Sequence, residues 1–265
     1  MLRGLYSSAT GMRAQEMMID NTANNLANVN TNGFKRSMLD FADLVYTTTT
    51  AAGSEIATGQ MTPTGLQIGS GVRAVGTNKV FTQGAVQRTD NQLDVAIEGG
   101  GFFKVTLPNG EFRYTRDGAF RTDAQGRLVT GDGFLVDGNV TIQDGVDLAR
   151  VGIGIDGTVT GFVAGAGQTV TQLGQIQLVR FPNPAGLSNE GGNLYSETPA
   201  SGTEVAGVPG TDGMGLLRQG HLEGSNVAVV SELISLITAQ RAYEINAKAI
   251  KAGDEMLSTS AQIIR

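Results

Sequence analysis

Glycine and proline are distributed so unevenly that they decide where long helices can form. Residues 1–32 contain only Gly4 and Gly11, and residues 225–265 contain only Gly253. All the other glycines, and all six prolines, lie between these two segments. In a helix interior glycine costs about 1 kcal/mol and proline about 3 kcal/mol. Long helices are therefore expected at the two ends of the chain and other structure in its middle.

The N-terminal segment carries an apolar stripe with helical spacing. Its members recur in steps of three and four residues, and only Glu16 interrupts them. The stripe consists of Leu2, Leu5, Ala9, Met12, Ile19, Ala23 and Leu26. Such a seven-residue repeat is typical of helices that pack side by side. An asparagine-rich run over residues 21–32 weakens the helix, and Gly33 suits a left-handed C-cap.

A longer stripe with the same spacing covers the C-terminal segment. Its members are Val229, Leu233, Leu236, Gln240, Tyr243, Ala247, Ile250, Asp254, Leu257, Ala261 and Ile264. A second apolar row, formed by Val230, Ile234 and Ile237, lies beside its first turns. Ser225 or Asn226 offers an N-cap for this helix.

Periodicity alone leaves two interpretations of these stripes open. Either the two helices form an antiparallel hairpin inside one chain, or the stripes pack against other molecules. The stripe on the C-terminal helix is wider than one short partner helix can cover. This width favours an intermolecular interface.

Residues 89–202 have the pattern of an antiparallel β-domain. The predicted strands are 93–98, 101–107, 111–116, 127–131, 158–163 and 175–181. Dipeptides that favour hairpin turns lie between or beside them, namely Asn109-Gly110, Asp117-Gly118, Asp132-Gly133, Asp137-Gly138, Asp144-Gly145 and Asp156-Gly157. The expected fold class is α+β, with long terminal α-helices in a coiled-coil domain, a central mainly-β domain of barrel or sandwich type, and an extended connecting domain.

Two polar segments have the composition of linkers. Residues 46–63, YTTTTAAGSEIATGQMTP, contain four consecutive threonines and little apolar periodicity. Residues 182–215 are rich in proline, glycine, serine and asparagine. Taken alone, both compositions favour mobile connections.

Few residues are placed for catalysis, cofactor binding or metal binding. The chain has no cysteine and one histidine, His221, which excludes thiolate chemistry and paired-histidine metal sites. Residues 152–157, GIGIDG, match G-x-G-x-x-G, but a strand-like segment follows where a dinucleotide site needs a helix. Most aspartates stand at predicted turns. We therefore expect no enzymatic activity, no cofactor and no metal ion.

Charge and hydropathy limit the partners. The net charge of −6 and the pI near 4.9 argue against binding to nucleic acid or to an anionic membrane. No segment approaches the roughly 18 consecutive apolar residues of a membrane span. The first twelve residues lack the apolar region of a secretory signal peptide, so the default expectation is the cytoplasm.

Four segments resemble the bacterial flagellar rod and hook proteins. They are ANNLANVNTNGFKR (23–36), LDVAIEGGGFFKV (93–105), YTRDGAFRTDAQGRLVTGDGFLV (114–136) and GHLEGSNVAVVSELISLITAQRAYEINAKAIKAGDEML (220–257). Within that family, the chain length and GLQIGSGV (65–72) are most similar to the distal rod proteins. A proximal rod protein, or another axial subunit of the family, is the alternative.

The resemblance implies a structural subunit that assembles helically into a straight, rigid, hollow drive shaft. Residues 1–35 and 224–265 would form the inner, channel-lining helical domain, and the apolar stripes would be its assembly interface. Residues 36–88 and 203–223 would form the connecting domain, including a rod-specific stiffening segment at 46–63. Residues 89–202 would form the outer β-domain.

The resemblance also implies a location and a set of partners. The partners are other copies of the chain, the proximal rod, the hook or hook-junction proteins, the P- and L-ring proteins and the flagellar type III export apparatus. The rod spans the periplasm in the basal body, and its subunits are exported without a cleaved signal peptide. This expectation replaces the cytoplasmic one.

Overall fold

The computed structural model describes residues 2–57, 60–61, 63–138, 140–142, 150–162 and 170–263. Two long helices stand at the ends of the chain and strands lie between them, so the α+β expectation is confirmed at this level. The contacts divide the chain into two compact units. Unit 1 contains Met1–Leu26, Ser37–Asn78 and Ala228–Arg265, and unit 2 contains Ala27–Arg36 and Lys79–Val227. The predicted three-domain division stays a prediction.

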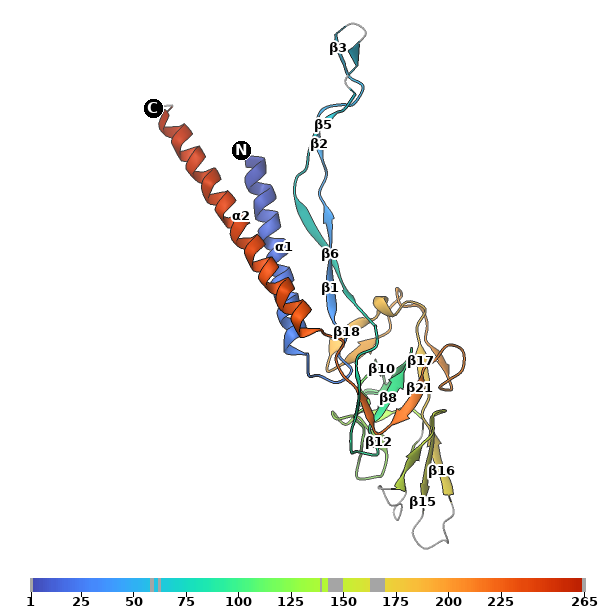
Figure 1. The fold of residues 1–265 in the computed structure, drawn as a ribbon. Helices are drawn as coiled ribbons and strands as arrows, with labels where there is room; N and C mark the ends of the chain where they lie inside the picture. Colours follow the sequence, from blue (N-terminus) through green and yellow to red (C-terminus); the bar gives the residue numbers. More distant parts are fainter. Residues whose placement is uncertain are drawn as a thin grey trace. The chain divides into compact units, whose positions relative to one another are not determined.

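The helices of unit 1 are α1, Leu2–Ala27, and α2, Val229–Ile263. They lie side by side (Figure 1). A β-carbon added to Gly11 would lie 3.1 Å from Nδ2 of Asn246, and one added to Gly253 would lie 2.7 Å from Cδ2 of Leu5. Positions rise along α1 as they fall along α2, so the pair is antiparallel. Two glycines thus permit the close approach of the helices.

The remainder of unit 1 is a long two-stranded ribbon (Figure 1). Its strands are β1 Ser37–Asp43, β2 Thr47–Thr50, β3 Glu55–Ala57, β4 Gln60–Met61, β5 Leu66–Ile68 and β6 Val72–Lys79. β1 pairs with β6, β2 with β5, and β3 with β4. The expectation of a linker over residues 46–63 is therefore wrong. β-branched threonines favour extended backbone, and main-chain pairing stabilises the ribbon without apolar periodicity.

Unit 2 consists mainly of short strands. Its first eight are β7 Val86–Arg88, β8 Val95–Glu98, β9 Phe102–Thr106, β10 Phe112–Thr115, β11 Arg121–Thr122, β12 Leu128–Val129, β13 Leu135–Val136 and β14 Gly152–Ile153. The others are β15 Thr158–Phe162, β16 Val170–Gln175, β17 Leu178–Arg180, β18 Ser188–Gly191, β19 Leu194–Ser196, β20 Val205–Gly207, β21 Leu216–Gln219 and β22 His221–Glu223. A 3-10 helix, η2, spans Pro184–Gly186.

The largest sheet that the described residues form has nine strands. Its order is β11-β12-β13-β9-β10-β19-β18, with β17 pairing with both β9 and β20. A three-stranded sheet has the order β14-β15-β16, and two further pairs are β21 with β8 and β22 with β7. Each of these pairings is antiparallel.

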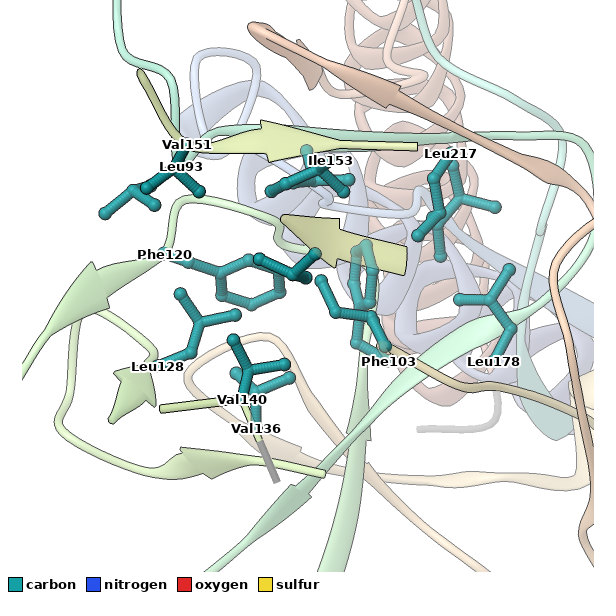
Figure 2. Close-up of a cluster of buried hydrophobic side chains, with 14 of the residues drawn as sticks. Leu93, Phe103, Phe120, Leu128, Val136, Val140, Val151, Ile153, Leu178 and Leu217 are labelled. Carbon is teal, nitrogen blue, oxygen red and sulfur yellow. The ribbon is translucent and has the colours of Figure 1, made fainter. Parts of the chain in front are cut away.

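The core of unit 2 lies on both faces of β9. Phe103 and Val105 belong to the larger cluster, in which Figure 2 shows Phe103 together with Ile153 of β14 and Leu217 of β21. Phe102 belongs to a second cluster with Tyr114, Phe181 and Tyr195. Successive side chains of a strand point to opposite faces, so β9 is buried on both sides.

The six predicted strands are confirmed as β8, β9, β10, β12, β15 and β17, each within two or three residues of the expected ends. Three of the predicted turns join paired strands, with φ of 84° at Gly110, 86° at Gly133 and 81° at Gly157. The dipeptide Asp144-Gly145 lies outside the described residues.

Three expectations for unit 2 are wrong. Residues 117–118 and 137–138 do not join paired strands. At Gly118 the constraint is instead close packing, because an added β-carbon would overlap the carbonyl oxygen of Val95. Residues 182–215 are not a linker, since β18 pairs with β19 and β20 pairs with β17. Backbone pairing again orders a segment whose composition is that of a loop.

Candidate assembly surfaces

The predicted stripe on α2 is divided between covered and exposed residues. Leu236, Ile250 and Leu257 are partly buried. Val229, Leu233 and Tyr243 are 41–42% exposed. Ile264 lies outside the described residues. The stripe therefore does not coincide with the face that α2 uses inside the chain.

The covered face of α2 follows its own seven-residue spacing. Glu232, Ala239 and Gly253 are buried, and Asn246 between them is partly buried. Each of these positions directly precedes a member of the predicted stripe, which rotates the face by about 100° on a helix of 3.6 residues per turn. Small and polar side chains pack inside the chain, and larger apolar ones remain on the surface.

The exposed apolar side chains of α2 form two rows over its first turns. Val230 is 70% exposed, Ile234 60% and Ile237 48%, beside Val229 and Leu233. Further along α2, Ile245 is 66% exposed and Met256 56%. Contiguous exposed apolar surface of this kind is typical of interaction sites.

The stripe on α1 is more fully covered. Leu5, Met12, Ile19 and Leu26 are partly buried, whereas Ala9 is exposed. Leu2 begins the helix, but its side chain lies outside the described part of the structure. The fully buried positions of α1 are instead Ala14, Thr22 and Asn25.

A groove runs between α1 and the ribbon. It has a volume of about 320 Å³ and is lined by Thr10, Arg13, Ala14, Met17, Leu44, Val72, Arg73 and Ala74. Beyond it the ribbon exposes more apolar side chains, among them Val45, Leu66 and Val75. Unit 1 therefore has apolar surface on the ribbon as well as on α2.

The helix α1 ends inside the asparagine-rich run, and two asparagines of that run also fasten it. The helix continues through Asn21 and Asn25 and ends at Ala27. Nδ2 of Asn21 and Nδ2 of Asn25 each donate to the carbonyl of Ser37 at 2.9 Å. Gly33 has φ of 68°, as expected, but it lies beyond the helix end and is not its cap. The spacing of four residues, which places Asn21 and Asn25 on one face, is the signal that could have revealed this anchor.

Within unit 2, a set of polar side chains joins four segments of the chain. We call it the polar clamp; its members are Lys35, Lys79, Thr82, Arg116, Glu223 and Asn226. Nζ of Lys35 lies 2.5 Å from Oε1 of Glu223, and both side chains are fully buried. Nη1 of Arg116 lies 3.4 Å from the other carboxylate oxygen of Glu223. The ion pair between Lys35 and Glu223 could not be predicted from the sequence, because the two residues are 188 positions apart.

Asn226 supplies the other half of the polar clamp. Its Oδ1 accepts from the backbone N–H of Arg36 at 2.7 Å, and its Nδ2 donates to the carbonyl of Val80 at 2.7 Å. It was expected as an N-cap, together with Ser225, but α2 begins at Val229. The hydroxyl of Ser225 accepts from the N–H of Val227 at 3.3 Å. Neither side chain caps α2 at its first turn.

Burial governs the ionisation of the polar clamp. Desolvation lowers the pKa of Lys35 from its usual value, and the charge and hydrogen bond of Glu223 oppose this effect. Desolvation also lowers the pKa of Lys79. A buried lysine of this kind depends on its carboxylate, because removing one partner leaves an uncompensated charge.

Residues considered for other chemistry have structural roles. Residues 152–157 lead into strand β15, as expected, so the dinucleotide context is missing. Nδ1 of His221, at the start of β22, lies 2.7 Å from the carbonyl oxygen of Gln219, at the end of β21. Across the described ranges, no group of three or more His, Asp or Glu side chains could hold a metal ion. No described helix combines the length and apolarity needed to cross a membrane.

Three protein-family models match parts of the chain. Residues 5–35 match a model described as flagella basal body rod protein. Residues 96–161 match the flagellar hook protein FlgE/F/G D1 domain. Residues 218–263 match the C-terminal region of the flagellar basal body rod FlgEFG proteins.

Similar proteins span the whole chain. A flagellar basal-body rod protein FlgG of Borreliella burgdorferi is 45% identical over 100% of both chains. One from Caulobacter vibrioides is 44% identical over 99% of each chain, and one from Bacillus subtilis is 40% identical over 100% of each.

Proposed function

The chain belongs to the FlgG family of flagellar basal-body rod proteins, and from this premise we propose that it assembles helically with its own copies into the distal rod. This family is a structural one, which agrees with the expectation of a subunit rather than an enzyme. The assembled rod is a straight, hollow drive shaft that transmits torque from the motor to the hook. Subunits that join through non-closing contacts generate such a tube.

The observation that carries the proposal is the exposed apolar surface of α2. Val229, Val230, Leu233, Ile234 and Ile237 stand on the surface of the unassembled chain. Burial contributes about 25 cal/mol for each Å² of apolar surface removed from water. Packing against other copies would recover this free energy many times along a polymer. A single active site is not needed for that function.

In the proposed rod, α1 and α2 form the inner coiled-coil domain around the channel. The predicted stripes, from Leu2 to Leu26 and from Val229 to Ile264, then make the lateral contacts between copies. The connecting domain lies outside the helices and the sandwich-like β-domain lies furthest out. The exposed members of the α2 stripe, Val229, Leu233 and Tyr243, support this arrangement. Leu5 of the α1 stripe packs against Gly253 inside the chain.

We place the stiffness of the rod in the outer part of the ribbon, over residues 46–63. β2, β3 and β4 belong to this segment, and β2 is held in register by β5, with Thr47 opposite Ile68. A paired ribbon resists bending more than a single extended strand does. Contacts of this ribbon with neighbouring copies would oppose curvature of the tube.

The subunit is proposed to reach the basal body through the flagellar type III export apparatus, without a cleaved signal peptide. Its neighbours along the axis are the proximal rod and the hook or hook-junction proteins. The P- and L-ring proteins surround it in the periplasm. No contact with nucleic acid and no insertion into a membrane are part of the proposal.

The assembly proposal is tested with Leu233→Asp in the purified full chain. Leu233 is 42% exposed, so the substitution leaves the internal core intact and puts a charge on the proposed interface. The matched control is Ala124→Asp, which adds the same charge to an exposed turn of unit 2. Assembly is followed by sedimentation and electron microscopy, and folding by circular dichroism.

We expect the native chain and Ala124→Asp to form tubes, and Leu233→Asp to stay monomeric with an unchanged spectrum. Normal tubes from Leu233→Asp would contradict the proposed interface. A native chain that forms no ordered polymer under any condition in which related rod proteins do would contradict self-assembly itself.

A further inference from the structure

Asparagine or aspartate followed by glycine can modify itself without an enzyme. The backbone nitrogen of the glycine attacks Cγ of the preceding side chain and closes a five-membered succinimide ring, and glycine has no β-carbon to obstruct this attack. The Cγ–Nδ2 bond of asparagine breaks, and Nδ2 leaves as ammonia with the proton of the attacking nitrogen; from a protonated aspartate, water leaves instead. A water molecule then opens the ring at either carbonyl carbon, giving aspartate or isoaspartate. The reaction needs only water and a glycine peptide that can turn toward the side chain.

Unit 2 contains such dipeptides in open and in packed surroundings. A β-carbon added to Gly110 or to Gly133 would meet nothing within 4 Å. One added to Gly213 would lie 3.3 Å from Nη1 of Arg180, the end of a side chain that can move. Three other glycines are packed so closely that an added β-carbon would overlap a main-chain carbonyl oxygen of another segment; they are Gly118, Gly138 and Gly157. The first two glycines therefore have the most room to turn.

Two of the aspartate sites form a matched pair. Asp132-Gly133 and Asp156-Gly157 each join two paired strands, with similar φ at the glycine (86° and 81°) and an exposed aspartate. In both turns the glycine N–H donates to the carbonyl three residues earlier at 3.0 Å. Of the two glycines, Gly157 alone is buried, and its carbonyl accepts from the N–H of Ile176 at 2.8 Å. Ring closure at Asp156 must disturb this packing, whereas ring closure at Asp132 need not.

Asn109 has a further advantage over the aspartates. Both Asn109 and Gly110 are exposed. The N–H of Glu111 donates to Oδ1 of Asn109 at 3.0 Å, which polarises the carbonyl that the glycine nitrogen attacks. An amide also reacts without being protonated first, as a carboxylate must be. Asn109 is therefore expected to react before Asp132.

We propose that Asn109 and Asp132 are sites of isoaspartate formation in the folded chain, and that packing of the glycine protects Asp117, Asp137 and Asp156. The fold thus decides which of several similar dipeptides react. At the protected sites the ring closes only after local opening, and the free energy of that opening lowers the rate.

The product at Asn109 changes the turn between β9 and β10. Isoaspartate adds one carbon to the main chain, inside a turn that the N–H of Leu107 closes by donating to the carbonyl of Glu111 at 2.9 Å. Deamidation also adds a negative charge next to Glu111. The modification therefore loosens this exposed turn and leaves the core of unit 2 in place.

The test follows the purified full-length chain during incubation at neutral pH and physiological temperature, with a parallel sample unfolded in urea. Isoaspartate is detected by methyl transfer from S-adenosylmethionine with an isoaspartate-specific methyltransferase. Mass spectrometry of tryptic peptides locates each site, because peptides 105–113, 128–150 and 151–180 contain Asn109, Asp132 and Asp156 in turn.

In the folded chain we expect Asn109 to be modified first and Asp132 next, with Asp156 at least about tenfold slower than Asp132 because it requires local opening. In urea, Asp132 and Asp156 are expected to react at similar rates. Asn109→Gln is the control for the assignment: a six-membered ring closes more slowly, so the signal of peptide 105–113 disappears and that of Asp132 stays. Thr158→Val is the control for the cause, since it removes the hydroxyl that donates to Asp156 at 2.6 Å and leaves Gly157 packed. Asp156 is expected to stay protected in this variant.

Equal rates at Asp132 and Asp156 in the folded chain would overturn the proposal, and so would an Asn109 that reacts only in urea. Rapid modification of Asp156 in Thr158→Val would also overturn it, because protection would then come from the side-chain hydrogen bond and not from packing of the glycine. All of these residues belong to unit 2. The result therefore does not depend on whether the chain assembles into a rod.

Discussion

Asn25 binds both polar backbone atoms of Ser37. Its Nδ2 donates to the carbonyl of Ser37, and its Oδ1 accepts from the Ser37 N–H, each at 2.9 Å. Asn25 is 1% exposed and Ser37 is 8% exposed. A helical side chain here takes the place of a neighbouring strand and fixes the point where β1 begins beside α1.

Replacing Asn25 with alanine is expected to lower the free energy of unfolding of unit 1 by about 1–2 kcal/mol. The buried N–H of Ser37 loses its partner, at about 1–3 kcal/mol, whereas the Ser37 carbonyl still accepts from Asn21, and the better helix propensity of alanine returns only about 0.6 kcal/mol. Chemical denaturation followed by helical circular dichroism measures the change. Asn30→Ala, at an exposed position of the following turn, serves as the control. Equal stability of the two variants would show that the anchor to Ser37 is not important.

A second prediction concerns Gly118. A β-carbon at this position would overlap the carbonyl oxygen of Val95, whereas one at Gly131 would meet nothing within 4 Å. The N–H of Val95 also donates to the carbonyl of Gly118 at 3.0 Å, so neither backbone can move freely. Gly118→Ala is expected to destabilise unit 2 by about 3 kcal/mol.

Gly131→Ala is the matched control for that experiment, and its expected effect is within about 0.5 kcal/mol. Thermal unfolding followed by tyrosine fluorescence reports on unit 2, because Tyr114 and Tyr195 are buried there. Similar melting temperatures for the two variants would refute the close-packing explanation of Gly118.

The sequence predicts which kinds of element form, but it does not predict which side of α2 is buried inside the chain. Helices at both ends and six strands follow from breaker density and short-range pattern, which are local properties. The internal face of α2 does not, because the apolar stripe marks the most hydrophobic side and the chain buries Ala239 and Gly253 instead. On α2, the most hydrophobic side and the side buried inside the chain are therefore different.

The polar clamp and the ribbon were beyond prediction for a different reason. Lys35 and Glu223 meet only through the fold, and nothing within a short window of either residue indicates a buried ion pair. Over residues 46–54, apolar alternation is lacking because the described side chains there are exposed or only partly buried. Both features depend on pairing between distant segments, whereas the family resemblance, which spans the chain, was confirmed by full-length relatives.

Tyr195 provides a prediction about alkaline pH. It packs against Phe81 and Phe102, with ring centroids 5.4 and 5.9 Å away. Burial raises the pKa of Tyr195 to about 12. The folded chain therefore holds this proton at pH values where the unfolded chain, with a tyrosine pKa of about 10, releases it. Stability conferred by the neutral phenol falls as pH rises from about 10 through about 12.

A change of two pKa units corresponds to about 2.7 kcal/mol. Between pH 10 and pH 12 the native chain is expected to lose up to that much free energy of unfolding because of Tyr195. Tyr195→Phe is expected to abolish this part of the loss, and urea unfolding at each pH measures the difference. Tyr243→Phe, at a 42% exposed tyrosine of α2, is the control and should follow the native profile. The lowered pKa of Lys35 acts in the opposite direction, but it is common to all three chains and cancels in the comparison. Identical slopes for Tyr195→Phe and the native chain would contradict the prediction.

The last prediction concerns the outer ribbon. Deleting residues 47–68 removes β2 to β5 as a complete hairpin and leaves the pairing of β1 with β6 intact. The junction is suitable because a β-carbon at Gly69 would lie 3.3 Å from the ring of Tyr46, so the two ends are already adjacent. A deletion of residues 46–63 alone would instead leave β5 without its partner.

We expect the chain lacking residues 47–68 to assemble, because α1 and α2 are unchanged, but to give curved or flexible tubes instead of straight ones. Electron microscopy of the polymers measures the persistence length directly. The control replaces Thr47–Thr50 with four valines, which keeps an extended β2 and changes only its side chains. Straight tubes from the deleted chain would show that stiffness originates elsewhere. Curved tubes from the valine variant would show that the stiffness depends on the threonine hydroxyls rather than on the paired backbone, since the substitution removes these hydroxyls.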